Sequence, residues 1–161
     1  MDEPGPLDPP DPPDPLDSHE MRAWIAFLEA SHLVEHEVQR QLKRDGGLSH
    51  ADFEVLINLR VAAEGRMRMS DLARKVMISK SRLTYQITQL ERAGLVRRTA
   101  CATDRRAVWA ELTEAGAATL ARVRPGHRRV VRDNLIDVLT PGELRTLGET
   151  LGRVADRLRG R

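Results

Sequence analysis

The sequence predicts a mainly helical fold with a small β-hairpin. Apolar residues recur at intervals of three and four over most of the chain, which is the spacing of the buried face of a helix. After Gly94 the interval falls to two over the segments 95–99 and 107–112, which are short enough to be strands. Serine or threonine precedes most of the periodic segments and provides typical helix caps, so the ends of the elements can be assigned.

Length and composition limit the class of protein. The chain has 161 residues, enough for one domain with a substantial core, and a single cysteine. One cysteine cannot form a disulfide framework, so we expect a reducing, cytoplasmic environment. The sequence contains no apolar run of transmembrane length, and its acidic N-terminus is unlike a secretory signal. It also lacks a glycine-rich phosphate loop, a nucleophile motif and a paired-carboxylate constellation, which argues against an enzyme.

Charge is distributed unevenly along the chain. Residues 1–20 contain seven acidic side chains and no Lys or Arg, although the whole chain has a formal net charge of +2. The remaining residues therefore hold 26 basic and 17 acidic side chains, a balance that suits a polyanionic partner. Because residues 1–17 are also rich in proline, we expect a disordered acidic tail.

Two helices are expected after this tail. The first runs from Ser18 to about residue 44 and ends at a Gly-Gly pair, and the second covers about residues 49–63 with Ser49 as its cap. The apolar stripe of the first helix is interrupted in its middle by Ser, His and Glu residues.

The segment 69–113 has the pattern of two short helices followed by a two-stranded ribbon, a winged helix-turn-helix. Ser70 is the expected cap of the first short helix and Ser79 that of the second, which ends at Gly94. The buried face of the second helix is predicted to consist of Leu83, Ile87 and Leu90.

The outer face of this second helix carries hydroxyl, amide, phenol and guanidinium groups, and no carboxylate before Glu91. Such groups donate to phosphates and read base edges in the major groove of double-stranded DNA. The residues predicted to contact DNA here are Ser79, Ser81, Arg82, Thr84, Tyr85, Gln86 and Thr88. The serines at the helix start are expected on phosphates, whereas Arg82, Tyr85 and Gln86 are the candidates for base edges.

The turn between the two expected strands, CATDRR, ends in Arg105 and Arg106. Arginines at the tip of a hairpin suit a minor groove, where the potential is most negative. Asp104 would pair with one guanidinium and hold it in a fixed direction. Arg66 and Arg68, which precede the first short helix, are predicted phosphate contacts.

Two further helices complete the chain. Thr113 is expected to cap a helix that runs towards residue 139 and is kinked or broken by Pro125-Gly126. The last helix begins at Thr140 with a proline and a capping-box glutamate, and its apolar stripe continues to Leu158. Neither the first nor the last helix can bury its stripe well within one chain, so we expect both to pack against a second copy in a two-fold dimer.

These motifs resemble the MarR family of dimeric bacterial transcription regulators. The resemblance is carried by the helix SKSRLTYQITQLERAGLVRR, by Asp104-Arg105-Arg106 and by LTEAG at 112–116, and it extends from Ser18 to Arg159. It implies a helical dimerisation region, 18–47 and 114–161, and a DNA-binding region, 48–113. A dimer would place its two recognition helices, the helix from Ser79 to Gly94 of each chain, about 34 Å apart, which is one turn of DNA.

The resemblance also implies a ligand crevice. In the family a small aromatic acid often enters between the dimerisation helices and the DNA-binding core, and an aromatic or phenolic effector is possible here. The residues predicted to line the crevice are Trp24, His32, His36, Phe53 and His127. The polar interruption of the first helix is equally consistent with a pocket wall and with buried polar pairs across a dimer.

Two other groups of residues are weaker candidates for sites. His32, Glu35 and His36 share a helix face, but no second ligand pair completes a zinc site, so no metal and no other cofactor is predicted. Cys101 lies at the base of the ribbon beside arginines that would lower its pKa. The oxidant-sensing cysteine of some family members usually sits near the first helix instead, so an inert small residue is the favoured interpretation of Cys101.

The sequence therefore favours a homodimeric, sequence-specific transcription regulator on a pseudo-palindromic operator, a repressor that a small ligand releases. The alternative is an architectural or nonspecific DNA-binding protein with the same winged core, because phosphate contacts alone carry no sequence information. A protein-interaction module that has lost DNA binding is a third hypothesis, and the arginine-rich turn argues against it.

Overall fold

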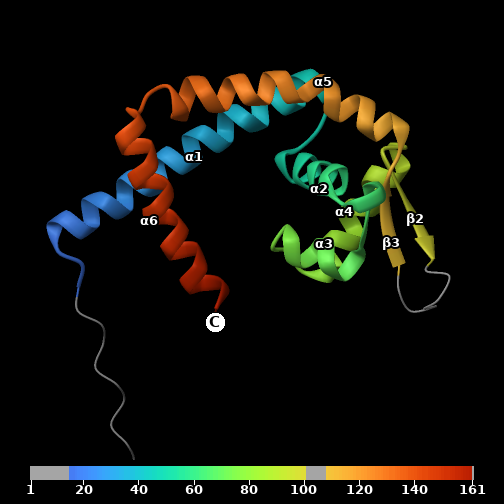
Figure 1. Cartoon of the computed structure of the whole chain (residues 1–161), viewed down its shortest axis with the longest axis horizontal. Helices are drawn as coiled ribbons and strands as arrows, with labels where there is room; N and C mark the ends of the chain where they lie inside the picture. Colours follow the sequence, from blue (N-terminus) through green and yellow to red (C-terminus); the bar gives the residue numbers. More distant parts are fainter. Residues whose placement is uncertain (1–14, 101–107, 161) are drawn as a thin grey trace, which may run out of the picture. The chain divides into compact units, whose positions relative to one another are not determined.

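The computed structural model describes residues 15–100 and 108–160, whose elements are shown in Figure 1. These residues divide into two compact units, one ending at His32 and the other beginning at Leu33. The elements are, in chain order, α1 (Ser18–Gly46), α2 (His50–Val61), a 3-10 turn (Ala63–Gly65), β1 (Arg66–Arg68), α3 (Met69–Lys75), α4 (Lys80–Arg92), β2 (Val96–Ala100), β3 (Val108–Leu112), α5 (Glu114–Val131), a π-helical turn (Arg132–Ile136) and α6 (Pro141–Arg159). The predicted class, mainly helical with a small sheet, is confirmed.

The hydrophobic core lies in the second unit. It is built from the end of α1, from α2, α3 and α4, from the inner face of the sheet and from α5. Its largest fully buried apolar side chains are Leu42, Val55, Leu56, Leu59, Leu72, Leu83, Ile87, Val96, Leu120 and Val123. The apolar face predicted for α4, which consists of Leu83, Ile87 and Leu90, is therefore the buried one.

Most of the predicted caps are present. The Ser49 hydroxyl accepts from the Asp52 N–H at 3.1 Å, and the Asp52 carboxylate accepts from the Ser49 N–H at 3.0 Å. Thr140 and Glu143 form the same reciprocal box at the start of α6. The assignment of Ser70 as a cap is wrong, because α3 already begins at Met69. β1 runs into α3 without a loop, so the capping position falls on the last strand residue.

The predicted two-stranded ribbon is a three-stranded antiparallel sheet with the order β1-β3-β2. Figure 1 shows β2 and β3 as neighbouring strands. β1 pairs with the central strand β3 in the register Arg66 to Glu111 and Arg68 to Trp109. The sequence did not predict β1, because three residues are too short for an alternating pattern to be recognised. Its existence depends on pairing with a distant segment.

Pro125-Gly126 was predicted to kink or break this helix, and the break does not occur, because α5 continues through both residues to Val131. Here α5 lies against the end of α1. The Gln41 amide donates to the Val123 carbonyl at 3.1 Å and to the Asp45 carboxylate at 2.9 Å. A Cβ on Gly126 would stand only 2.6 Å from Gln41 Nε2, so the glycine permits this close approach. Contacts between the two helices thus support the segment that contains the proline.

The terminal helices expose their apolar stripes. In α6 no residue is buried, and Leu151, Val154 and Leu158 are 39, 51 and 61% exposed. In the first unit Met21, Trp24 and Ile25 of α1 are also exposed, at 41 to 52%. The described part of one chain therefore leaves the stripe of α6 and the N-terminal part of the stripe of α1 exposed, whereas Val38 and Leu42 of α1 enter the core. Among the described residues, none of the helices combines the length and the apolar character needed to cross a bilayer.

Candidate nucleic-acid interface

Helix α4 presents one polar face and one buried face. Its start is fixed by Ser79, whose hydroxyl accepts from the Arg82 N–H at 3.2 Å. Met77, with a φ of +54°, turns the chain between α3 and α4. The apolar stripe of α4 enters the core. This orientation turns the remaining face of α4 outward.

The outward face carries most of the predicted contact residues. Ser79, Ser81, Arg82, Thr84 and Tyr85 are exposed, and Tyr85 is 69% exposed despite its aromatic ring. The hydroxyl oxygens of Ser79 and Ser81 lie 3.1 Å apart at the helix start. These groups present hydroxyl, phenol and guanidinium donors in one region, which is the chemistry that DNA phosphates and base edges accept.

The prediction that Gln86 reads a base edge is contradicted. Gln86 is only 8% exposed, and its side-chain amide points towards Asp52 Oδ1 at 3.4 Å. The reason is helical geometry, because Gln86 lies three residues after Leu83 and next to Ile87 on the buried face. Its position connects α4 to α2 rather than to a ligand.

Thr88 is half-buried and its hydroxyl is already engaged. It donates to the Thr84 carbonyl at 2.8 Å and accepts from Arg98 Nη2 at 3.1 Å. Arg98, on β2, also donates to the Glu91 carboxylate at 2.7 and 3.0 Å. The Arg98 guanidinium and N–H donors hold the pKa of the Glu91 carboxyl below its usual value. Thr88 therefore contributes to a link between α4 and the sheet, which the sequence did not predict.

The exposed face of the sheet forms a second basic surface, which we call the outer sheet face. It consists of Arg66, Arg68, Arg97, Trp109 and Glu111, which the strand registers bring to one side. Arg97 and Glu111 form a two-pronged ion pair, with nitrogen–oxygen distances of 2.5 and 3.0 Å. This pair raises the pKa of Arg97 and lowers that of Glu111. The sequence pattern that could have placed Trp109 and Glu111 on this face is the alternation along residues 108–112, in which both residues lie on the side opposite Ala110.

The residues predicted at the tip of the ribbon, Asp104, Arg105 and Arg106, lie outside the described residues, as does Cys101. Their assignments stay predictions. The described base of the ribbon, β2 and β3, carries the Arg97–Glu111 pair.

Two residues of the predicted ligand crevice, Phe53 and His127, lie together in the second unit. The rings of Phe53 and His127 stack with centroids 4.4 Å apart and planes at 25°. Burial, and secondarily the charge of His50, lower the pKa of His127. Trp24 and His32 belong to the first unit, where Trp24 stacks on Phe27 at 6.1 Å between centroids.

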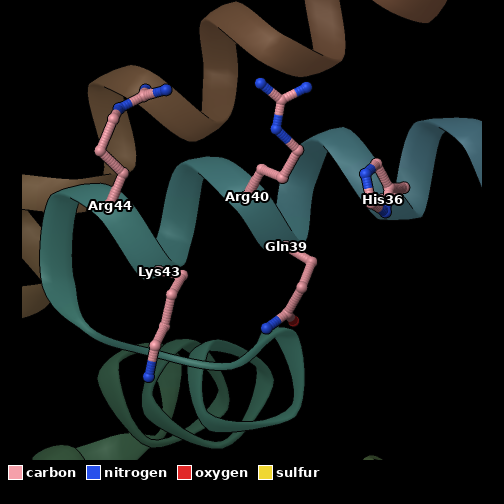
Figure 2. A pocket seen from close by; sticks show the side chains of 5 residues that line it. All are labelled: His36, Gln39, Arg40, Lys43 and Arg44. Carbon is pink, nitrogen blue, oxygen red and sulfur yellow. The ribbon is translucent and has the colours of Figure 1, made fainter.

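His36 lines a basic pocket of about 440 Å³ instead. Figure 2 shows that the side chains lining it all come from α1 and project on both sides of the helix: His36, Gln39, Arg40, Lys43 and Arg44. The Gln39 side chain also accepts from the His50 N–H at 2.7 Å, which connects this helix to α2. Within the described ranges there is no group of three or more His, Cys, Asp or Glu residues that could hold a metal ion.

Known proteins with similar sequences are transcriptional regulators. The MarR family model matches residues 48–108. The transcriptional regulator PecS of Dickeya dadantii is 35% identical over 112 residues, covering 69% of this chain and 67% of that protein. The transcriptional regulator MhqR of Bacillus subtilis is 28% identical over 134 residues, covering 83% of this chain and 90% of that protein.

Two solved structures from Streptomyces coelicolor are similar throughout. AbsC, a MarR family transcriptional regulator, has a TM-score of 0.89 at 44% identity, covering 92% of this chain and all of that one. Sco3205, a MarR family transcriptional regulator in complex with DNA, has a TM-score of 0.89 at 38% identity, covering 92% of each chain. The helical pair with its three-stranded sheet defines a winged helix-turn-helix transcription regulator. The chain belongs to the MarR family.

Proposed function

We propose that the chain is a homodimeric regulator that binds a pseudo-palindromic operator in double-stranded DNA, with α4 in the major groove. The observation that carries the proposal is the exposed face of α4, where Arg82, Thr84 and Tyr85 project opposite a stripe packed in the core. The DNA complex of Sco3205, at 38% identity, supports DNA as the partner.

The exposed stripes of the terminal helices support the dimer. Leu151, Val154 and Leu158 of α6 leave apolar surface in contact with water, as do Met21 and Ile25 of α1. Burying such surface against a second copy is favourable by roughly 25 cal/mol per Å². A two-fold dimer would present two α4 helices about 34 Å apart, which matches half-sites one DNA turn apart.

The test compares two duplexes of equal length at physiological salt, one from the region upstream of the protein's own gene and one of random sequence. We expect tighter binding to the first by about 10³-fold or more. Arg82→Ala should weaken specific binding by about 1–3 kcal/mol, because a guanidinium facing a guanine would be lost. Arg153→Ala removes the same charge from α6 and should leave specific binding unchanged.

Two results would contradict the proposal. Equal affinity for the two duplexes would favour a nonspecific or architectural protein, because phosphate contacts do not discriminate sequences. Unchanged specific affinity in Arg82→Ala would remove that residue from base recognition.

We further propose that a small aromatic acid regulates DNA binding and releases a repressor from its operator. Support comes from Arg40 and Arg44, which line the pocket on one side of α1 and suit an anion that displaces Glu37 and Asp45, and from the aromatic stack of Phe53 on His127. A ligand that prefers the conformation with mismatched α4 spacing would shift the dimer away from DNA. Titration of the operator complex with aromatic and phenolic acids tests this proposal. A complex that none of these acids dissociates would argue against it.

A further inference from the structure

The outer sheet face carries two guanidinium groups next to an indole. Arg66 Cζ lies 5.2 Å and Arg68 Cζ lies 5.5 Å from the centroid of the Trp109 ring, both within the range of cation–π attraction. We propose that Trp109 is a positioning residue for DNA binding, and that it holds Arg66 and Arg68 as a clamp for DNA phosphates. This inference rests on the proposed function and adds a second point of contact to it.

The sheet determines the geometry of the clamp. Trp109 is half-buried on the central strand β3, where both neighbouring strands restrain it. Arg68 is its direct partner across β1, and Arg66 lies two residues earlier on the same face. Alternate residues of a strand are about 6.6 Å apart, a separation that suits neighbouring phosphates along one DNA strand. The indole thus lies beside two guanidinium groups whose side chains leave the strand about 6.6 Å apart.

An indole orients a guanidinium without neutralising it. Arg97, on the same face, is bonded through two nitrogens to the Glu111 carboxylate, which neutralises its charge and occupies two of its five N–H donors. A stacked guanidinium instead keeps its charge and the N–H groups at its edge, which are the groups that grip a phosphate. Arg66 also forms an ion pair with Glu64, in which the two side chains are 45 and 69% exposed. A surface pair of this kind is weak, so a phosphate can replace it.

The place of the clamp in the chain favours the DNA backbone over the bases. β1 leads directly into α3, with Arg68 at the position before its first residue. In a helix-turn-helix the first helix of the pair crosses the backbone while the second enters the groove. Contacts from Arg66 and Arg68 should therefore be independent of sequence and strongly dependent on salt.

The first experiment measures the affinity of the full chain for a random-sequence duplex over a range of salt concentrations. The slope of log affinity against log salt should fall by about 2 in Arg66→Ala/Arg68→Ala, about one for each phosphate that is no longer bound. Arg153→Ala, on α6, should leave the slope unchanged. Both arginines are exposed, so the double variant should fold normally. A wild-type slope in a folded double variant would overturn the proposal.

The second experiment tests Trp109. Trp109→Leu should weaken binding to the same duplex about fivefold, and Trp109→Phe, which retains a ring face, should recover most of this loss. In the background of Arg66→Ala/Arg68→Ala, Trp109→Leu should have no further effect. An equal loss in both backgrounds would show a purely structural role and overturn the assignment. If Trp109→Leu fails to unfold cooperatively, Trp109→Met, which also lacks a ring face, replaces it in the same two backgrounds.

Failure of this proposal is distinguishable from failure of the proposed function. If the wild type binds both duplexes equally, but Arg66→Ala/Arg68→Ala has a smaller salt slope than wild type, the clamp is supported and sequence-specific regulation is contradicted. If the wild type prefers its operator, but Arg66→Ala/Arg68→Ala has the same salt slope as wild type, sequence-specific regulation is supported and the clamp is contradicted.

Discussion

His127 shows how a single side chain can couple packing to pH. It stacks on Phe53 in a half-buried position, and burial together with the charge of His50 lowers its pKa from the usual 6.5. The folded protein therefore resists protonating this imidazole more than the unfolded chain does. Below about pH 6.5 the unfolded state takes up the proton first, and the folded state loses stability relative to it.

We predict that the free energy of unfolding falls as the pH decreases from about 7.5 towards about 5.5, and falls less in His127→Phe. The variant keeps an aromatic ring against Phe53 but has no imidazole to titrate. Denaturant unfolding at several pH values measures the difference. Parallel pH profiles for the two proteins would show that His127 does not contribute. The measurement at about pH 7.5 serves as the control for packing, because the imidazole is then largely neutral in both states.

Among the elements, α4 and β2 are joined by the ion pair of Glu91 and Arg98. Both side chains are about one-third exposed, and Arg98 donates in addition to Thr88. The link connects the helix proposed to face DNA to the strand that leads towards the ribbon tip. It should therefore fix the angle between the two parts of the interface as well as contribute to stability.

We predict that Glu91→Gln lowers the free energy of unfolding by about 1 kcal/mol, since it removes one charge of a partly exposed pair. Operator affinity should fall as well, because α4 and β2 lose a shared restraint. Thermal unfolding and operator titration measure the two effects. Asp156→Asn breaks an exposed pair with Arg159 on α6 and should change neither. Unchanged operator affinity in Glu91→Gln would show that the pair does not orient the interface.

Local signals predicted the elements that local interactions determine. Ser79 and Thr140 were recognised as caps because a side chain bonded to the backbone three residues later requires only short-range geometry. β1 was not predicted, because it depends on pairing with β3, which is distant in the sequence. The break expected at Pro125 did not occur, because Gln41 of α1 contacts α5 next to the proline. At the site, the exposure of Tyr85 on the outer face of α4 was predicted correctly, and its contact with DNA stays a prediction. The burial of Gln86 was not predicted, because its partner Asp52 lies on another helix and the sequence of α4 alone does not indicate that contact.

For the whole molecule, the uncovered stripe of α6 is the feature that one chain does not explain. Leu144, Leu147, Leu151, Val154 and Leu158 follow one another at intervals of three and four along a single face. None of them is buried, although α6 has a complete capping box and regular helical structure. When a helix is stably formed but buries none of its apolar side chains in the core of its own chain, those side chains are expected to be buried against another chain in an assembly.

We predict that Leu151→Glu/Val154→Glu converts a dimer into a monomer of 18.1 kDa, because two carboxylates would enter an apolar interface. Operator affinity should fall with it, since two linked half-site contacts become independent ones. Sedimentation equilibrium measures the mass and a titration measures the affinity. Thr146→Glu/Arg153→Glu places the same side chains on the opposite face of α6 and should remain a dimer. A dimeric Leu151→Glu/Val154→Glu protein would exclude α6 from the interface and leave the exposed stripe of α1 to account for self-association.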